Sequence, residues 1–241
     1  MAKQVAFVTG AAQGIGRATA ARLAKDGFHV IAMDRSPSVK DAAAQLQQQG
    51  LDVVAAVVDI CDRSGVIAVL AGQPRVDVMV CAAGIYNDAA LLDLTEDAFR
   101  QMLEVNVIGT FIPAQEAARR MTAGGRIVTI SSRVALGGTR FAHYVASKAA
   151  VIGLTRAMAM ELRGAQIAVN SVAPGFTDTP MTRSAPAEMF AAWEKIEPSG
   201  KAASPDDIAN AIAFLSASST QFITGQTLFV DGGKSLGGLT I

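Results

Sequence analysis

One pair of side chains in the sequence could transfer a proton. Tyr144 and Lys148 stand four positions apart in the segment HYVASKAA, so on a helix they would lie one above the other on a single face. A free phenol has a pKa of about 10 and is a poor base at neutral pH, whereas a buried ammonium beside it favours the phenolate. The pair therefore predicts either a tyrosine that acts as acid and base or two surface residues that align by chance.

The elements that must position this pair alternate between strand and helix. The strands are apolar on both faces, as in a parallel sheet that helices cover on both sides. The alternation predicts an α/β fold of βαβ units with right-handed crossovers. Predicted strands cover 5–9, 29–33, 52–58, 76–81, 125–131, 166–173 and 227–230, and predicted helices cover 14–26, 38–49, 62–71, 95–122, 142–163 and 205–217.

Length and composition favour one compact domain over 1–241. Hydrophobic residues make up 51% of the chain, and its 21 basic residues balance 21 acidic ones without a basic run. We therefore expect no nucleic-acid partner. Cys61 and Cys81 lack metal-ligand spacing and read as reduced, buried thiols. The apolar stretches are too short for a signal peptide or a membrane span, so we expect a cytoplasmic protein without a metal site.

Residues 174–204 interrupt the alternation with four prolines and one short amphipathic piece at 187–196. A long irregular insertion beside a sheet usually covers a site. We expect the part from about 176 to 204 to cover the substrate.

The turn after the first strand, TGAAQGIG, could bind a diphosphate. Gly10 permits the tight turn, while Gly14 and Gly16 let a helix begin close to the strand and let a phosphate approach the backbone. The helix N-terminus then offers free N–H groups and a partial positive charge.

Asp34 ends the second strand, 18 residues after Gly16. A carboxylate there can accept hydrogen bonds from both ribose hydroxyls of adenosine and repels a 2′-phosphate, which favours NAD over NADP. Arg35 follows at once and could instead pair with that phosphate. Asp59, at the end of the third strand, is a candidate for the adenine edge. Each aspartate could also simply cap the next turn.

These residues belong to a larger ordered set, and the chain resembles the short-chain dehydrogenase/reductase family over nearly its whole length. The matching pieces are TGAAQGIG (9–16), Asp34, Asp59, CAAG (81–84), Asn106 in EVNVIGTF, TISS (129–132), YVASK (144–148), PGFTDT (174–179) and VDGG (230–233). The resemblance implies a Rossmann-like doubly wound parallel sheet of about seven strands, a nicotinamide cofactor and oxidation of an alcohol to a carbonyl. Family members are usually homotetramers, and the apolar segments 150–162 and 235–241 suit such contacts.

The resemblance also implies roles for individual residues. The catalytic set is Asn106, Ser132, Tyr144 and Lys148, with Ser131 as the alternative serine because the serine-to-tyrosine interval is unusual. The family's fourth-strand motif usually begins with Asn where this chain has Cys81. The implied cofactor contacts are Gly10, Gln13, Gly14, Ile15, Gly16, Asp34, Arg35, Asp59, Ile60, Ala82, Ala83, Gly84, Tyr144, Lys148, Pro174, Gly175, Thr177 and Thr179.

In the implied mechanism Tyr144 takes the alcohol proton while hydride leaves the carbon for nicotinamide C4. Lys148 and the nicotinamide charge would lower the phenol pKa by roughly three units. Ser132 would hold the substrate oxygen. Lys148 would also bind the nicotinamide ribose, and Asn106 would anchor a water linked to Lys148.

The substrate pocket is expected between 133–143 and 178–203. Arg133 and Arg140 could bind an anionic substrate or could be solvated surface charges, and His143 could tune the pocket or be a partly buried residue at a helix start. The expected substrate contacts are Ser132, Arg133, Leu136, Tyr144 and Met181, with Phe141, Phe190 and Trp193 as further lining residues.

Three functions remain open at this stage. The first is an NAD-dependent dehydrogenase or reductase that acts on a small or medium, partly apolar alcohol or ketone. The second is an NADPH-dependent 3-ketoacyl-thioester reductase with the same catalytic set, and the third is a non-enzymatic dinucleotide sensor. Asp34 argues against the second, and the intact Ser, Tyr, Lys and Asn set argues against the third.

Overall fold

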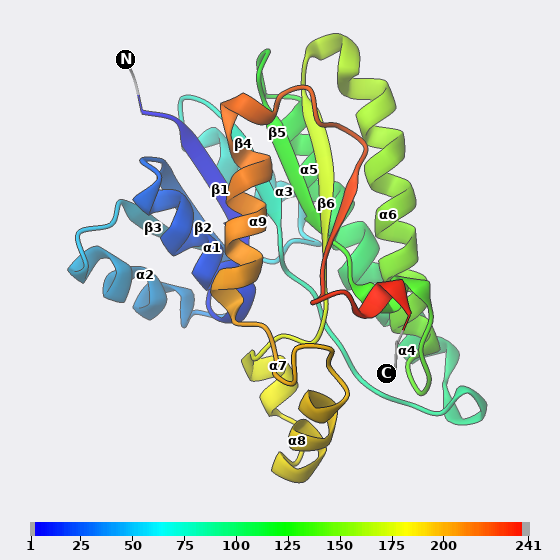
Figure 1. The fold of residues 1–241 in the computed structure, drawn as a ribbon. Helices are drawn as coiled ribbons and strands as arrows, with labels where there is room; N and C mark the ends of the chain where they lie inside the picture. Colours follow the sequence, from blue (N-terminus) through cyan, green and yellow to red (C-terminus); the bar gives the residue numbers. More distant parts are fainter. Residues whose placement is uncertain (1–2, 238–241) are drawn as a thin grey trace.

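A computed structural model describes residues 3–237 of the chain (Figure 1). Its centre is a parallel sheet in the order β3-β2-β1-β4-β5-β6-β7. This confirms the expected α/β fold with a Rossmann-like, doubly wound sheet of seven strands. The strands are β1 (Val5–Thr9), β2 (His29–Asp34), β3 (Val53–Val57), β4 (Val78–Cys81), β5 (Arg126–Ile130), β6 (Ala168–Pro174) and β7 (Thr227–Val230).

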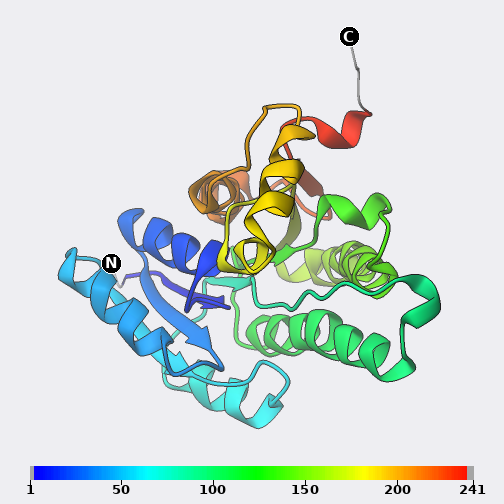
Figure 2. The ribbon, with the colours of Figure 1, turned by 90° about the horizontal axis from the view of Figure 1, so that it is seen from below.

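Helices cover both faces of the sheet, which explains why its central strands are apolar throughout (Figure 2). On β1, Ala6 and Val8 face the layer of α1 (Gly14–Lys25), α2 (Val39–Gln48) and α9 (Pro205–Ser216). Val5 and Phe7 face the opposite layer of α3 (Arg63–Ala71), α5 (Gly109–Ala118) and α6 (Ala142–Leu162). These four strand residues are buried, and burying a large apolar side chain contributes about 1.5–3 kcal/mol.

The helical region expected over 95–122 is not one regular helix. It consists of α4 (Glu96–Leu103), a π-helical turn η2 (Glu104–Ile108) and α5, which contains Pro113. Single π-turns are frequent at functional sites. Asn106 occupies the middle of this turn, and its backbone carbonyl accepts a hydrogen bond from Thr110 Oγ1 at 2.8 Å. The wider turn therefore coincides with one of the expected catalytic residues.

The insertion after β6 forms two short helices, α7 (Pro180–Arg183) and α8 (Ala187–Lys195). They project beyond the carboxyl ends of the strands (Figures 1 and 2). The amphipathic piece at 187–196 corresponds to α8, whereas the sequence pattern gave no sign of the four-residue α7. Short 3₁₀ turns complete the secondary structure at η1 (Leu91–Asp93), η3 (Arg133–Leu136), η4 (Arg163–Ala165), η5 (Ser218–Thr220) and η6 (Lys234–Leu236).

Across residues 3–237, the model contains no helix with the length and apolar character needed to cross a membrane. The apolar tail at 235–241, expected to form contacts between copies, extends past the described residues after position 237.

Candidate active site

A cleft of about 380 Å³ opens at the carboxyl ends of β1, β2 and β4. The strand order reverses between β1 and β4, which is where open α/β sheets bind ligands. The expected cofactor residues that line the cleft are Gly10, Gln13, Gly14, Ile15, Gly16, Asp34, Arg35, Asp59, Ile60, Ala82, Ala83, Gly84 and Thr179. The lining also includes Met181 and residues that sequence reasoning missed, namely Ala12, Ser36, Ser38, Val58, Ile85, Val105 and Pro180.

The glycine turn has no room for side chains at two positions. A Cβ at Gly10 would lie 2.8 Å from the backbone of Ala83, and Gly10 has a positive φ of 68°. A Cβ at Gly16 would lie 2.2 Å from the carbonyl oxygen of Gly10. The first turn therefore packs directly on the turn after β4, and α1 begins against β1. No side chain caps the N-terminus of α1, so its N–H groups remain available at the cleft.

Asp34 connects the end of β2 to the glycine turn. Its carboxylate accepts hydrogen bonds from the backbone N–H of Ala12 at 3.1 Å and of Ser36 at 2.9 Å. Asp59 caps its own turn by accepting the N–H of Cys61 at 2.9 Å. Both aspartates thus satisfy the capping interpretation and also line the cleft, so the two interpretations are compatible. Arg35 is exposed and forms no ion pair within the described residues.

Tyr144 and Lys148 lie together on α6, as their spacing predicts. The Lys148 ammonium is 5.7 Å from the centroid of the Tyr144 ring, and it donates a hydrogen bond to the carbonyl of Ile130 at 2.9 Å. A Cβ built on Gly84 would lie 3.5 Å from Lys148 Nζ. Lys148 therefore lies next to the cleft-lining residue Gly84, whereas neither Tyr144 nor Lys148 is among the residues that line the cleft.

The two candidate serines point to different partners. Ser131 is buried, and its hydroxyl donates to the backbone carbonyl of Lys148 at 2.8 Å. Ser132 is partly exposed, and its hydroxyl oxygen accepts a hydrogen bond from the N–H of Val134 at 3.3 Å. Hydrogen bonding with the same hydroxyl lowers the pKa of Tyr144. Ser131 therefore fastens β5 to α6, and Ser132 is the serine on the side of the phenol.

Burial dominates the ionisation of the pair. It raises the pKa of Tyr144 to about 12, with the Ser132 hydroxyl acting in the opposite direction and Tyr86 adding a smaller increase. Burial also lowers the pKa of Lys148 to about 8. Desolvation thus raises the phenol pKa. The expected decrease depends on Lys148 together with the nicotinamide charge and stays a prediction.

The side chain of Asn106 is fully buried and joins three segments. Its Oδ1 accepts the N–H of Ile85 at 2.8 Å, and its Nδ2 donates to the carbonyl of Ile85 and to Ser147 Oγ, both at 3.1 Å. Ile85 lines the cleft and Ser147 precedes Lys148 on α6. The amide thus fixes the cleft wall relative to the helix that carries the Tyr–Lys pair.

The PGFTDT segment lies partly behind the cleft. A Cβ at Gly175 would meet the backbone of Asp231 at 2.7 Å, so the closing VDGG segment packs on this turn. Thr177 is buried and donates to the carbonyl of Gly175 at 3.1 Å. Thr179 lines the cleft and caps α7 reciprocally with Thr182. Pro174, Gly175 and Thr177 do not line the cleft.

Comparison with known proteins assigns the chain to a family. A family model described as enoyl-(acyl carrier protein) reductase matches residues 10–235. The subunit BbsD of (2S)-[(R)-hydroxy(phenyl)methyl]succinyl-CoA dehydrogenase from Thauera aromatica is 38% identical over 97% of each chain. The chain belongs to the short-chain dehydrogenase/reductase family.

Other relatives of this short-chain dehydrogenase/reductase cover two kinds of activity. Cis-4-hydroxycyclohexanecarboxylate dehydrogenase from Sinomonas cyclohexanicum is 38% identical over 96% of each chain. The 3-oxoacyl-[acyl-carrier-protein] reductase FabG of Rickettsia bellii is 37% identical over 95% of this chain and 96% of FabG. A crystal structure of a putative NAD(P)-dependent gluconate 5-dehydrogenase from Beutenbergia cavernae, with bound NADP at low occupancy, is 37% identical with a TM-score of 0.90 over 97% of each chain. By their names, these relatives are dehydrogenases and reductases, and the chain is thus similar to oxidoreductases.

Two of the expected pocket residues pack against Phe176 within the insertion. Phe190 is buried, with its ring 4.9 Å from that of Phe176 and the Arg183 guanidinium 3.9 Å from its centroid. Trp193 meets Phe176 edge-on, with centroids 5.6 Å apart. Phe190 thus packs on the rest of the insertion through the apolar face of α8. Neither Phe190 nor Trp193 lines the cleft, and their place in the substrate pocket stays a prediction.

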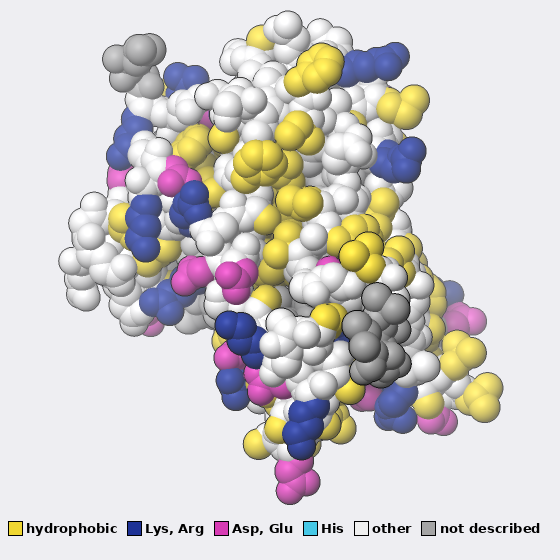
Figure 3. Space-filling model, in the orientation of Figure 1, with side chains coloured by type: hydrophobic (Ala, Val, Ile, Leu, Met, Phe, Trp, Pro, Cys, Tyr) yellow, Lys and Arg dark blue, Asp and Glu magenta, His cyan; other side chains and the backbone are white. Residues whose placement is uncertain are grey.

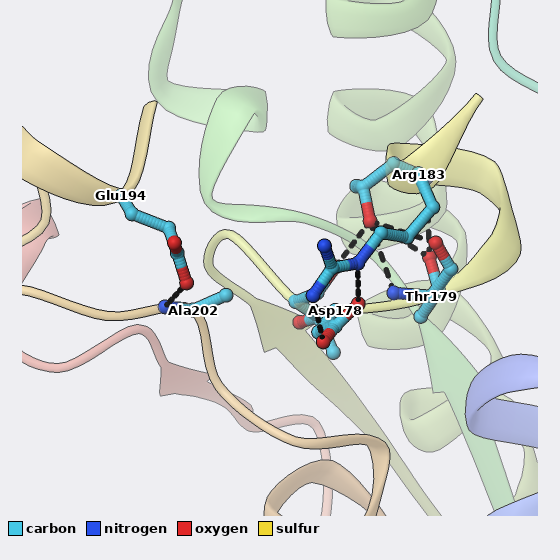
Figure 4. A network of polar contacts seen from close by, with 7 residues as sticks. Asp178, Thr179, Arg183, Glu194 and Ala202 are labelled. Carbon is cyan, nitrogen blue, oxygen red and sulfur yellow. Dashed lines mark hydrogen bonds and ion pairs between the residues drawn. The ribbon is translucent and has the colours of Figure 1, made fainter. Parts of the chain in front are cut away.

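Polar contacts hold the same segment in place (Figure 4). Arg183 donates to Asp178 through two nitrogens at 2.6 and 2.7 Å, and Glu194 accepts the N–H of Ala202 at 3.2 Å.

Of the other expected substrate contacts, Met181 lines the cleft, and Leu136 is exposed on η3.

The charged residues near the serine differ in their partners. Arg140 pairs with Asp88 at 2.9 Å, which supports the surface-charge interpretation for Arg140. Arg133 is half-buried and makes no ion pair within residues 3–237. His143 is fully buried, with Nε2 2.5 Å from Asn87 Oδ1, and desolvation lowers its pKa.

Tyr86 is a residue near the site that sequence reasoning missed. Its ring stands at 87° to that of Tyr144 with centroids 5.2 Å apart. No spacing rule links it to α6, and only its position two residues after Gly84 could have drawn attention to it.

Both cysteines are free thiols, but only one is buried as expected. Cys81 is buried and donates weakly to the carbonyl of Thr110, with burial raising its pKa to about 12. Cys61 is half-buried, because it lies in the turn after β3.

Proposed function

We propose that this protein is an NAD-dependent alcohol dehydrogenase/reductase, in which Tyr144 exchanges a proton with a secondary alcohol or its ketone while hydride passes to or from the coenzyme. One observation carries the proposal. The Tyr144–Lys148 pair on α6 lies next to the cleft-lining residue Gly84, on which a Cβ would come within 3.5 Å of Lys148 Nζ.

The residues of the cleft fit a dinucleotide. At Gly10 and Gly16 the chain packs so closely on itself that a side chain would clash with the backbone. A turn without side chains lets a diphosphate approach its N–H groups. The uncapped N-terminus of α1 offers N–H donors to it. When bound, an oxidised nicotinamide coenzyme would accept the hydride and add a positive charge near the phenol.

Each catalytic residue has a distinct proposed task. Tyr144 takes the proton of the alcohol, or returns it in the reverse direction. Ser132 holds the substrate oxygen, because its hydroxyl is on the side of the phenol. Lys148 stabilises the phenolate and binds the nicotinamide ribose. Asn106 is a positioning residue that keeps the cleft wall and α6 in register.

The backbone after β6 completes the proposed coenzyme site. We assign Pro174, Gly175, Thr177 and Thr179 to the carboxamide end of the nicotinamide, with Thr179 as the member that lines the cleft. Lowering the pKa of Tyr144 from about 12 to about 8 requires roughly 5–6 kcal/mol of differential stabilisation of the phenolate. Lys148, Ser132 and the coenzyme charge together are the proposed sources.

Coenzyme choice depends on the end of β2. The Asp34 carboxylate favours the two free ribose hydroxyls of NAD over a 2′-phosphate. A 2′-phosphate would instead meet Arg35, Ser36 and Ser38, which line the cleft. The hydroxyl oxygens of the two serines are 2.7 Å apart. We propose NAD because Asp34 faces the cleft with a fixed carboxylate.

A ketoacyl-thioester reductase that uses NADPH is the alternative, supported by the 37% identity to FabG. The two proposals share a catalytic set and differ in coenzyme and substrate. A non-enzymatic sensor is the least supported, since it would not need the Ser132–Tyr144–Lys148 arrangement.

We further propose that the protein is a homotetramer of the cytoplasm. Hydrophobic side chains gather over α9 and β7 (Figure 3), where Phe214 and Leu228 are exposed by 51% and 40%. On α6 the exposed positions include Gly153, Ala157 and Met160, which form a smooth strip suited to helix pairing. A monomer in size-exclusion chromatography with light scattering would contradict this.

The decisive experiment measures nicotinamide absorbance with NAD and with NADP across a panel of secondary alcohols and hydroxy acids. The reverse reaction is tested with ketones and with an acetoacetyl thioester. NAD-linked turnover of an alcohol supports the first proposal, whereas faster reduction of the thioester with NADPH supports the alternative. In Tyr144→Phe, kcat should fall by about 10²–10⁴-fold, while NADH binding persists.

A further inference from the structure

Tyr86 places a second aromatic ring against the proposed proton-transfer residue. It follows the cleft-lining residues Gly84 and Ile85 and is half-buried. Its ring meets that of Tyr144 edge-on at 87°, with centroids 5.2 Å apart, and lies 5.9 Å from the ring of Phe141. Edge-to-face geometry at this distance is a preferred aromatic arrangement.

The segment that carries Tyr86 is fastened to the loop before α6. Arg140 Nε donates to Asp88 at 2.9 Å, and the N–H of Ala89 donates to the carbonyl of Arg140 at 2.7 Å. The buried His143 contacts Asn87 Oδ1 at 2.5 Å.

On its other side, the same segment is held by Asn106, which bonds both backbone groups of Ile85. Tyr86 thus sits between two anchored points, and its ring has little freedom to leave Tyr144.

We propose that Tyr86 is a positioning residue for the reaction, which holds the ring of Tyr144 in its reactive orientation and keeps water from one side of the phenol. This inference rests on the proposed function, in which Tyr144 exchanges the proton. A small misplacement of a reacting group costs a large factor in rate, so a fixed neighbour matters more here than at an ordinary aromatic contact.

The ionisation of Tyr144 reports on this contact. The titratable groups that face Tyr144 are Lys148 from α6 and Tyr86 from the segment after β4, while Ser132 contributes a neutral hydroxyl. The charge of Asp88 raises the pKa of Tyr86, and the charge of Arg140 lowers it. Without the Tyr86 ring, water would reach the phenol and its pKa would fall from about 12 toward the ordinary value.

The composition makes a direct test possible, because the chain has only two tyrosines. Tyr86→Phe keeps the ring and Tyr86→Leu removes it, and either variant leaves Tyr144 as the sole tyrosine. Tyrosinate absorbance is followed up to pH 11, with circular dichroism as a check on folding. With a pKa of about 12, only about a tenth of Tyr144 is ionised at pH 11.

We expect Tyr86→Phe to keep this low ionisation and to retain kcat within about twofold of the wild type. Tyr86→Leu should show at least about half of Tyr144 ionised at pH 11 and a kcat about tenfold lower, with unchanged NADH affinity. Equal ionisation and equal kcat in the two variants would overturn the inference.

A third variant covers the case in which Tyr86→Leu does not fold. Arg140→Gln cuts the exposed ion pair to Asp88 and leaves both rings in place. It should shift Tyr144 ionisation and kcat in the same direction by a smaller factor, and wild-type values for both would count against the inference. Failure of the wild type to oxidise any alcohol would instead refute the proposed function, while the ionisation measurement would still test the contact.

Discussion

The charge of Lys148 should account for a definite part of the reactivity of Tyr144. Its ammonium lies 5.7 Å from the centroid of the phenol ring. Taking that distance and an effective dielectric constant of about 20, a unit charge stabilises the phenolate by about 3 kcal/mol. Each 1.36 kcal/mol is a factor of ten in equilibrium. Lys148→Met removes the charge and keeps most of the side-chain stem, and should therefore lower kcat near neutral pH by about 100-fold.

The pH profile separates this effect from simple loss of structure. Without the ammonium, the phenolate forms only at higher pH, so the acid limb of kcat for alcohol oxidation should move upward by about two pH units. The deficit relative to the wild type should shrink as pH rises, because both proteins then approach full ionisation. Steady-state rates at saturating coenzyme and alcohol from pH 6 to 10.5 provide the measurement.

A matched control removes a lysine that has no place in the cleft. Lys25 is exposed in the last turn of α1, so Lys25→Met should leave both kcat and the pH profile unchanged. If Lys148→Met kept kcat within threefold of the wild type with an unmoved acid limb, the electrostatic reasoning would be refuted. A uniform loss at all pH values would point to damage to substrate or coenzyme placement instead.

Four further predictions concern stability, the glycine turn, coenzyme choice and substrate charge. Burial lowers the pKa of Lys148 from 10.5 to about 8, so the unfolded chain binds more protons than the folded one between these pH values. In urea titrations, the free energy of unfolding of the wild type should therefore rise by about 3 kcal/mol from pH 8 to pH 10.5, relative to that of Lys148→Met. Gly16→Ala should weaken NADH binding at least tenfold in a fluorescence titration, because its Cβ would lie 2.2 Å from the carbonyl of Gly10, and unchanged binding would contradict the tight-turn explanation. Asp34→Ser should raise the kcat/KM ratio of NADP to NAD by about 10–100-fold, since about 1.4–2.8 kcal/mol of repulsion is removed; an unmoved ratio would exclude Asp34 as the selector. If the half-buried guanidinium of Arg133 binds a substrate carboxylate, Arg133→Leu should raise KM about tenfold for a hydroxy acid but not for its neutral ester. Equal effects on the KM of both substrates would argue for a solvated charge.

The sequence by itself determined the fold and named the main residues of the candidate site. Both predictions depend on short-range rules. Strands that are apolar on both faces predict a parallel sheet covered by helices, and a glycine turn between a strand and a helix predicts an anion site. The i, i+4 spacing of Tyr144 and Lys148 brings them together on any helix. The family resemblance, now confirmed, rests on the same ordered motifs. The individual roles of these residues remain predictions.

Only the tertiary structure decided the surroundings of those residues. The direction in which Ser131 and Ser132 point depends on how β5 meets α6. Phe190 packs against Phe176 inside the insertion. The amphipathic pattern of a helix shows that a residue is buried but not which residue it contacts.

The contact between Tyr86 and Tyr144 joins segments 58 positions apart, and the high pKa of Tyr144 results mainly from its burial in the folded chain. Spacing along the chain reports which residues share a local face. Burial, dielectric environment and contacts across the fold arise from packing between distant segments, and only the folded chain specifies them.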